Sequence, residues 1–381
     1  MNKTNVQQIF SHYLDKFEYI TDTNGHNENY KWFIAKKFRS LMDDALSKNA
    51  DEFVNALNEA KKATKNIIDS YTQPFAGLVE FAKYEPETVK QMFIDLYSDD
   101  GGNIHKQEKL ISDFFDKSNK LLNKYSPESF LYKQNSHSVS AYLFLYDPDS
   151  HYMYKAEQSK KFADCIEFYD DWGYGDNIKL DVYYKMCDWL VEQISLCPEL
   201  LETDKSRFEI SNNEEMFTDI NKHMLAFDII YACSVYDLFD GISFTRPKLH
   251  EKKLIIERRN KALKLLEEYN NTLQEQKEIN QTIKILDKKL VAGTIIHHKK
   301  HGTGKLISCN NGIAEIAFDK TADIRKFDIK TILSINAARI EDKQLAKCIL
   351  SLIPHLKNKD NIQNKVNWAK AQFEPYAEYL E

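Results

Sequence analysis

The chain has no glycine between Pro247 and Leu290, and this uninterrupted stretch constrains the fold more than any other feature. It is rich in Lys, Glu, Leu, Gln and Asn, and its apolar residues recur at heptad spacing. One heptad position holds Ile255, Ala262, Tyr269, Ile283 and Leu290, and another holds Leu266 and Leu273. Such a repeat buries one seam of a helix against a partner helix. We therefore predict a long helical spacer over residues 246–291 that pairs in a hairpin or a coiled coil.

Three polar residues, Gln276, Asn280 and Asp287, interrupt this seam. A polar residue at a seam position lowers the stability of an isolated helix pair. We therefore expect the helix to pack within a larger assembly rather than as a stable isolated dimer. An oligomer formed through residues 250–290 is the alternative.

The charge of the chain is divided unequally about this spacer. Residues 1–250 hold 28 Lys and Arg against 41 Asp and Glu, a net charge of −13, whereas residues 251–381 hold 24 against 17, a net charge of +7. A positive surface attracts a polyanion because binding releases condensed counterions. The sequence therefore favours contact with a partner at the C-terminal end, and the alternative is that the asymmetry is only solvated surface.

Length and composition indicate a packed chain with more than one core. Its 381 residues exceed the roughly 250–300 at which a single core stops growing, and 43% of them are hydrophobic. The longest apolar runs are far shorter than a membrane-spanning helix, and no export signal precedes them, so we expect a cytoplasmic protein without membrane contact. The six cysteines form no C-x-x-C pair, which is typical of reduced thiols rather than of a zinc site.

Residues 1–245 are predicted to form a helical domain. Apolar residues recur at helical spacing through residues 1–130, and Pro86 suits the first turn of a helix. Residues 139–146 are apolar throughout and fit either a buried strand or a helix, whereas residues 151–155 alternate like a strand. A further buried helix is expected over residues 213–240.

Residues 292–336 change to short β-branched runs separated by glycine and asparagine, ending at Ile332-Leu333. Asn311-Gly312 is a strong signal for a hairpin turn. The pattern predicts a compact five-stranded barrel, followed by a helical tail over residues 337–381. The predicted fold class is therefore mainly α with a small all-β module.

Basic residues of this module are the candidate nucleic-acid contacts: Lys299, Lys300, His301, Lys305, Arg325 and Lys326. Such side chains contact phosphates without reading base sequence. Gly302 to Lys305 is not a phosphate loop, because Lys299 and Leu306 stand where that motif needs Gly and Ser or Thr. Adjacent strand residues point to opposite faces, so at most two of His297, His298 and His301 converge, and we expect no metal or cofactor.

A dense group of aromatic residues lies in the acidic part of the chain: Tyr142, Tyr152, Tyr154, Trp172 and Tyr174. Aromatic rings can stack on a flipped or single-stranded base, but buried core is the alternative for most of them. No residue is assigned a catalytic role. A metal-dependent nuclease or other hydrolase with a site built from residues distant in sequence is the alternative function, and a purely structural subunit is a third.

The run Gly293 to Ile307, together with Ala314 to Phe318, resembles the Tudor/SH3-like module of UvrD/PcrA-type helicases and of the RNA-polymerase-binding CarD family. In this resemblance His301 replaces the usual aromatic residue before Gly302. The resemblance covers residues 293–335 and implies a small barrel without catalytic residues. It also implies docking on nucleic acid or on an RNA polymerase or helicase-type machine.

Residues 73–83, 85–97 and 139–155 resemble the region that precedes the AAA+ motor in McrB-like proteins of modification-dependent restriction systems. The resemblance spans about residues 28–245, and the chain has no Walker sequence. It implies a recognition or adaptor role in antiviral defence, with any AAA+ or nuclease activity in a separate subunit. The function predicted from the sequence is thus a non-catalytic nucleic-acid-binding or adaptor protein.

Overall fold

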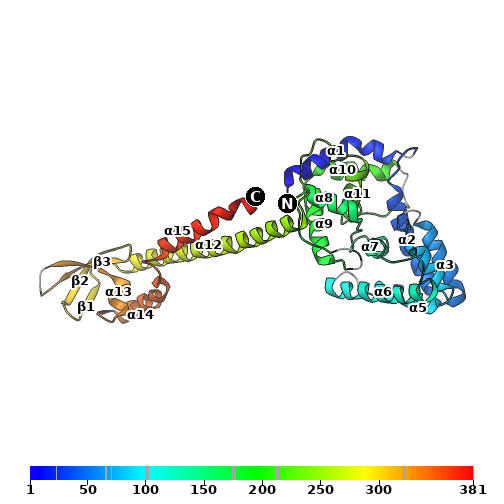
Figure 1. Cartoon of the computed structure of the whole chain (residues 1–381). Helices are drawn as coiled ribbons and strands as arrows, with labels where there is room; N and C mark the ends of the chain where they lie inside the picture. The colour runs from blue at the N-terminus through cyan, green and yellow to red at the C-terminus, as the bar shows by residue number, and fades with distance from the viewer. Residues whose placement is uncertain are drawn as a thin grey trace. The chain divides into compact units, whose positions relative to one another are not determined.

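The computed structural model describes residues 1–22, 24–64, 67–69, 71–98, 103–173, 175, 177–210, 215–320 and 323–380. Contacts divide the chain into two compact units, Met1–Lys252 and Lys253–Glu381. The first unit, blue to green in Figure 1, is helical and has no strand among its described residues. The second unit carries a small sheet and several helices. None of the described helices combines the length and apolar character needed to cross a membrane.

Eleven helices are described in the first unit. They are α1 Lys3–Thr21, α2 Tyr30–Ser47, α3 Ala50–Ala63, α4 Pro74–Ala82, α5 Pro86–Leu96, α6 Ile104–Tyr125, α7 Ser136–Tyr146, α8 Ala156–Cys165, α9 Leu180–Ser195, α10 Pro198–Ile210 and α11 His223–Val235. Local chemistry sets several of their starts, since asparagine side chains accept backbone N–H groups at the N-termini of α1, α3, α6 and α7. Helix α5 begins at Pro86, as predicted.

Two hydrophobic cores lie in the first unit. One is built mainly from α2 to α7, and the other from α1 and α8 to α11. Nearly every side chain of α7 is buried, so the helix shows no polar face. This resolves residues 139–146 as a helix, and it explains why hydrophobic periodicity could not distinguish the two alternatives.

Two local expectations for the first unit are wrong. Residues 151–155 pair with no described strand. Tyr152, Met153 and Tyr154 are all buried, so the side chains do not alternate between a buried and an exposed face. The Tyr154 N–H donates to Ser140 Oγ at 3.0 Å instead of to a strand. The helix expected over residues 213–240 is shorter. The Asp219 carboxylate accepts the N–H groups of residues 224 and 225 at 3.2 and 2.9 Å, so α11 begins only at His223.

The second unit contains five short strands, as predicted, but the sheet is open. The strands are β1 Ile295–His298, β2 Gly302–Asn310, β3 Ile313–Phe318, β4 Ile324–Asp328 and β5 Ala338–Ile340. All neighbours are antiparallel, in the order β4-β3-β2-β1-β5. A closed barrel needs a ladder between β4 and β5, and no such ladder exists among the described residues, so the expected barrel closure is wrong.

The fifth strand lies later in the chain than expected. Ile332 and Leu333 belong to helix α13, Ile329–Ser334, rather than to a strand. Asp328 starts this helix, since its carboxylate accepts the Thr331 N–H at 2.7 Å. The hairpin predicted at Asn311-Gly312 is confirmed, because both residues adopt positive φ angles of 54° and 72°, as a two-residue turn requires.

Helices complete the second unit: the larger part of α12 Leu249–Lys289, then α14 Lys343–Leu352, η1 Ile353–Leu356, α15 Ile362–Phe373 and η2 Glu374–Leu380. The end of α12 enters the core of the sheet through Ile279, Ile283 and Leu286. Toward its N-terminal end, α12 lies beside α15 (Figure 1) and contacts η2. Contacts run antiparallel, with Tyr269 stacked on Phe373 and Lys261 donating to the Tyr376 hydroxyl at 2.6 Å. The C-terminal tail of the chain therefore covers part of the predicted seam.

Candidate nucleic-acid interface

The register of the sheet decides which basic residues share a face. Side chains alternate along a strand, and directly paired residues point to the same side. Ile295 pairs with Lys305, and Lys299 continues β1 because its N–H donates to the Ala337 carbonyl at 2.8 Å. Lys305, Ala317 and Lys326 follow the same side across β2, β3 and β4. We call this side, opposite the buried core residues, the outer face.

Three lysines of the predicted set are exposed and carry unbalanced charge. Lys299, Lys300 and Lys305 form no ion pair within the described residues, and all three are exposed. Lys326 is exposed too, but its ammonium lies 2.8 Å from the Glu315 carboxylate. Arg325 lies 3.5 Å from Asp323. The positive charge available to a partner therefore comes mainly from the three unpaired lysines.

Among the predicted residues, His301 lies in a cluster of four rings. The rings of His298, His301, Phe318 and Phe327 lie with centroids 4.7 to 6.1 Å apart. Arg325 pairs with the buried Ile316 and so lies on the side of the sheet opposite Lys326. Partial burial lowers the pKa of His301, and the nearby charges of Arg325, His298 and Lys300 lower it further. His301 therefore favours the neutral form more than an isolated imidazole does.

His297 lies apart from His298 and His301, so only two of the three histidines converge, as strand alternation predicts. The His298 Nδ1 atom accepts the Lys300 N–H at 3.1 Å, which fixes the turn between β1 and β2. His297 points to the outer face, where its Nε2–H donates to Glu341 at 2.8 Å and its Nδ1 lies 3.0 Å from the Thr303 hydroxyl. No group of three potential metal ligands occurs among the residues that the structure describes.

One basic residue of the outer face was missed by sequence reasoning. Arg339 lies directly opposite His297 in the ladder between β1 and β5 and is exposed. It falls in the segment predicted as a helical tail, and only the non-local pairing of β5 with β1 brings it to the sheet. No local sequence signal marks it.

The aromatic candidates of the first unit are core residues. Tyr142 is fully buried in one core, and Tyr152, Tyr154 and Trp172 are at most 5% exposed in the other. Their polar atoms are engaged internally, as in the Trp172 Nε1–H that donates to the Tyr154 hydroxyl at 3.3 Å. A base cannot stack on a ring without an exposed face, so these residues are not part of the interface. Tyr174 lies outside the described residues.

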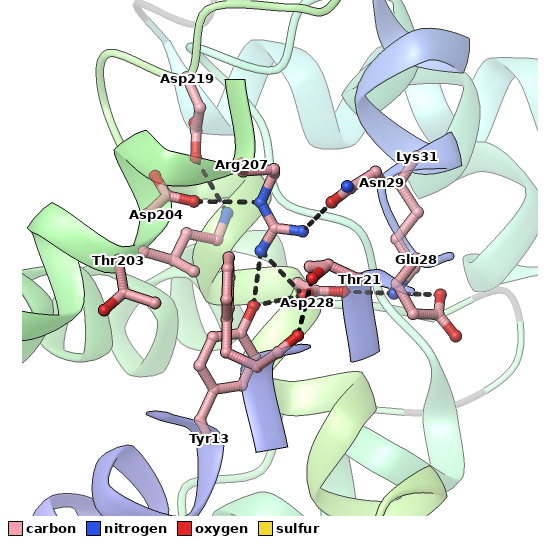
Figure 2. A network of polar contacts seen from close by, with 12 residues as sticks. Tyr13, Thr21, Glu28, Asn29, Lys31, Thr203, Asp204, Arg207, Asp219 and Asp228 are labelled. Carbon is pink, nitrogen blue, oxygen red and sulfur yellow. Dashed lines mark hydrogen bonds and ion pairs between the residues drawn. The ribbon is translucent and has the colours of Figure 1, made fainter. Parts of the chain in front are cut away.

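A buried network of charges connects helices of the first unit (Figure 2). Arg207 of α10 donates to the Tyr13 hydroxyl at 2.7 Å and lies 3.4 Å from Asp204 and 3.5 Å from Asp228. Asp228 also accepts a hydrogen bond from Lys31 at 2.5 Å. Burial alone would raise the pKa of Asp228, but the charges of Lys31 and Arg207 outweigh it and lower that pKa.

This network stabilises the fold rather than forming a binding site. Arg207 and Asp228 have no exposed surface, and the Arg207 guanidinium lies 3.9 Å from the centre of the Trp32 ring. Asp228 of α11 lies beside Arg207 and Lys31, and Lys222 lies 3.0 Å from Asp204, so these buried charges are paired between elements, which is the condition under which buried charges are tolerated. The network thereby holds α1, α2, α10 and α11 together.

The chain matches no protein-family model, no curated protein and no solved structure. Its function therefore has to be argued from the geometry of its own sites.

Proposed function

We propose that this protein binds nucleic acid through the outer face and the adjacent β1–β2 turn of the second unit, without catalysing a reaction. The observation that carries the proposal is the set of three exposed lysines without ion pairs, Lys299, Lys300 and Lys305. Lysines free of internal partners can neutralise phosphates and so release the counterions condensed on the nucleic acid, and this release supplies most sequence-independent affinity. The positive net charge of residues 251–381 supports the same conclusion.

We further propose that the sheet is a Tudor/SH3-like module. Five short antiparallel strands support this, because β1 pairs with both β2 and β5, and among the described residues only the ladder between β4 and β5 is lacking for closure. The ring of His301 lies beside Phe318 and Phe327, which supports an aromatic-like role for His301 at the position where the resembling modules carry an aromatic residue. Helix α12 would pair with the C-terminal tail as a helical hairpin beside this module, which the antiparallel contacts between them support.

The test compares the wild-type protein with a variant in which Lys299, Lys300 and Lys305 are changed to Gln. Fluorescence anisotropy would follow labelled single-stranded DNA, duplex DNA and RNA over a range of salt concentrations. Each duplex phosphate contact contributes about 0.9 to the slope of log affinity against log salt, so three lost contacts reduce the slope by about 2.7. With equal affinities of the two proteins at 1 M salt, this difference in slope makes the variant bind about a hundredfold more weakly than the wild type at 0.15 M salt.

A matched control removes three other exposed lysines, Lys109, Lys120 and Lys185, which lie on helices of the first unit. Both variants lose the same net charge. Equal effects of the two variants on affinity and on the salt slope would overturn the proposed interface. Turnover of the probe in the presence of Mg²⁺ would instead favour the nuclease alternative.

The resemblance of residues 28–245 to restriction-system proteins leads us to propose an adaptor role in antiviral defence, with AAA+ or nuclease activity in a separate subunit. Docking on an RNA polymerase or helicase-type machine would use the same basic surface. Neighbouring genes test this part of the proposal. A restriction or AAA+ gene beside this one supports it, and an unrelated metabolic operon contradicts it.

A further inference from the structure

A hollow in the second unit lies between the end of β1 and the turn that leads from α13 into β5. The residues lining it are His297, His298, Lys299, Asn336, Ala338 and Arg339. The paired strands β1 and β5 form the floor of the hollow. No long loop therefore separates its lining residues from the sheet. The hollow is therefore a fixed part of the fold.

Two cations border this hollow without internal partners. His297 pairs with Arg339, and the Lys299 N–H donates to Ala337, so Lys299 and Arg339 are diagonal neighbours on the outer face. Neither forms an ion pair within the described residues. Two cations in diagonal positions of one face can both contact a single anion that lies between them. The arrangement therefore favours occupation by a negative group.

The acidic residue that directly follows β5 is already engaged. Glu341 accepts a hydrogen bond from His297 Nε2 at 2.8 Å, so its carboxylate is held by His297 rather than by Arg339. Asn336 adopts a positive φ angle of 51° at the turn and is exposed, and its side-chain amide donates no hydrogen bond to another described residue. The hollow thus offers one guanidinium, one ammonium and one free amide N–H.

We propose that this hollow binds one phosphodiester group of the nucleic-acid strand. Arg339 provides a planar fork that matches two phosphate oxygens, Lys299 provides a point charge, and Asn336 donates a neutral hydrogen bond. The inference rests on the proposed function, and it extends the interface to Asn336 and Arg339, which sequence reasoning did not select. It also gives the strand a fixed point on an otherwise diffuse basic surface.

The test measures DNA binding by Arg339→Gln and Arg339→Lys in the full chain. We expect Arg339→Gln to weaken binding about tenfold, as for the loss of a charge-assisted hydrogen-bonded pair. Arg339→Lys keeps the charge and loses the fork, so it should weaken binding while leaving the salt slope unchanged. Lys347→Gln is the matched control, since Lys347 is an exposed cation on α14. Thermal unfolding checks that each variant is folded.

The outcomes separate this inference from the proposed function. If the triple lysine variant loses binding and Arg339→Gln behaves like Lys347→Gln, the hollow is not a phosphate site although the interface stands. If neither variant loses binding, both proposals fail. Competition by inorganic phosphate identifies the ligand: displacement of DNA from the wild type but not from Arg339→Gln supports a phosphodiester site. Binding of free phosphate at Arg339 without any DNA binding would overturn the assignment to nucleic acid.

Discussion

Replacing Arg207 by Met tests whether the buried network holds the first unit together. The change removes a guanidinium that has no exposed surface and contacts Tyr13, Asp204 and Asp228. Breaking a buried ion pair by removing one partner costs about 3–5 kcal/mol. Asp204 keeps Lys222 at 3.0 Å and Asp228 keeps Lys31, so we expect the lower end, about 3 kcal/mol.

Because the chain has two units, its unfolding is not expected to be a single two-state transition. Three of the four tryptophans, Trp32, Trp172 and Trp189, belong to the first unit, whereas Trp368 is 62% exposed in the second. A Trp368→Phe background therefore makes tryptophan fluorescence in urea report on the first unit alone. The assay is the free energy of unfolding extrapolated from that transition.

Lys205→Met is the matched control, because its ion pair with Glu202 is exposed at 69% and 77%. Exposed pairs contribute about 0–1 kcal/mol, so this variant should unfold near the wild-type midpoint. A loss smaller than about 1 kcal/mol for Arg207→Met would refute the view that the network stabilises the fold. The folded-state pKa of Asp228 is lowered, so its contribution is present above the unfolded pKa of about 3.9 and disappears as pH falls through the folded pKa. The difference between wild type and Arg207→Met should accordingly narrow below about pH 4.

Three further predictions concern the second unit. Gly312→Ala should destabilise it by about 1 kcal/mol or more in thermal unfolding, because φ is 72° and the added Cβ would lie 2.9 Å from Lys359 Nζ; an unchanged midpoint would contradict this. Burial, followed by the hydrogen bond to Asp287, raises the pKa of Cys309 to about 12. Asp287→Asn should lower this pKa, increase the thiolate fraction and so speed alkylation of Cys309 by iodoacetamide at pH 8, as measured by mass spectrometry. Glu341→Gln should strengthen DNA binding about two- to threefold in the anisotropy assay, since it removes a negative charge beside Arg339, and weaker binding would count against the phosphate site.

Local sequence chemistry predicted those elements whose signals lie within a few residues. The Asn311-Gly312 turn and the start of α5 at Pro86 are set by backbone preferences that neighbours do not change. The strand predicted at residues 332–333 was wrong because their apolar character was given more weight than Asp328, whose side chain starts a helix. The cap was visible in the sequence, and a reading based on caps would have found α13.

Contacts between residues far apart in the chain were not accessible in the same way. Tyr13 and Asp228 are separated by 215 positions, and no periodicity connects them, so the buried network could not be predicted. The same limit applies to the interface. The sequence selected cations that cluster locally, but the register divides them, placing Lys305 on the outer face and Arg325 on the other side.

The pairing of β5 with β1 is the step on which the functional argument depends most. It joins Arg339 to a surface that begins with Lys299, forty residues earlier in the chain, and neither cation forms an ion pair among the described residues. Diagonal neighbours on one face are close enough for a single phosphate to contact both side chains. The proposed phosphodiester site therefore depends on the pairing of β5 with β1, because no local segment of the sequence brings the two cations together.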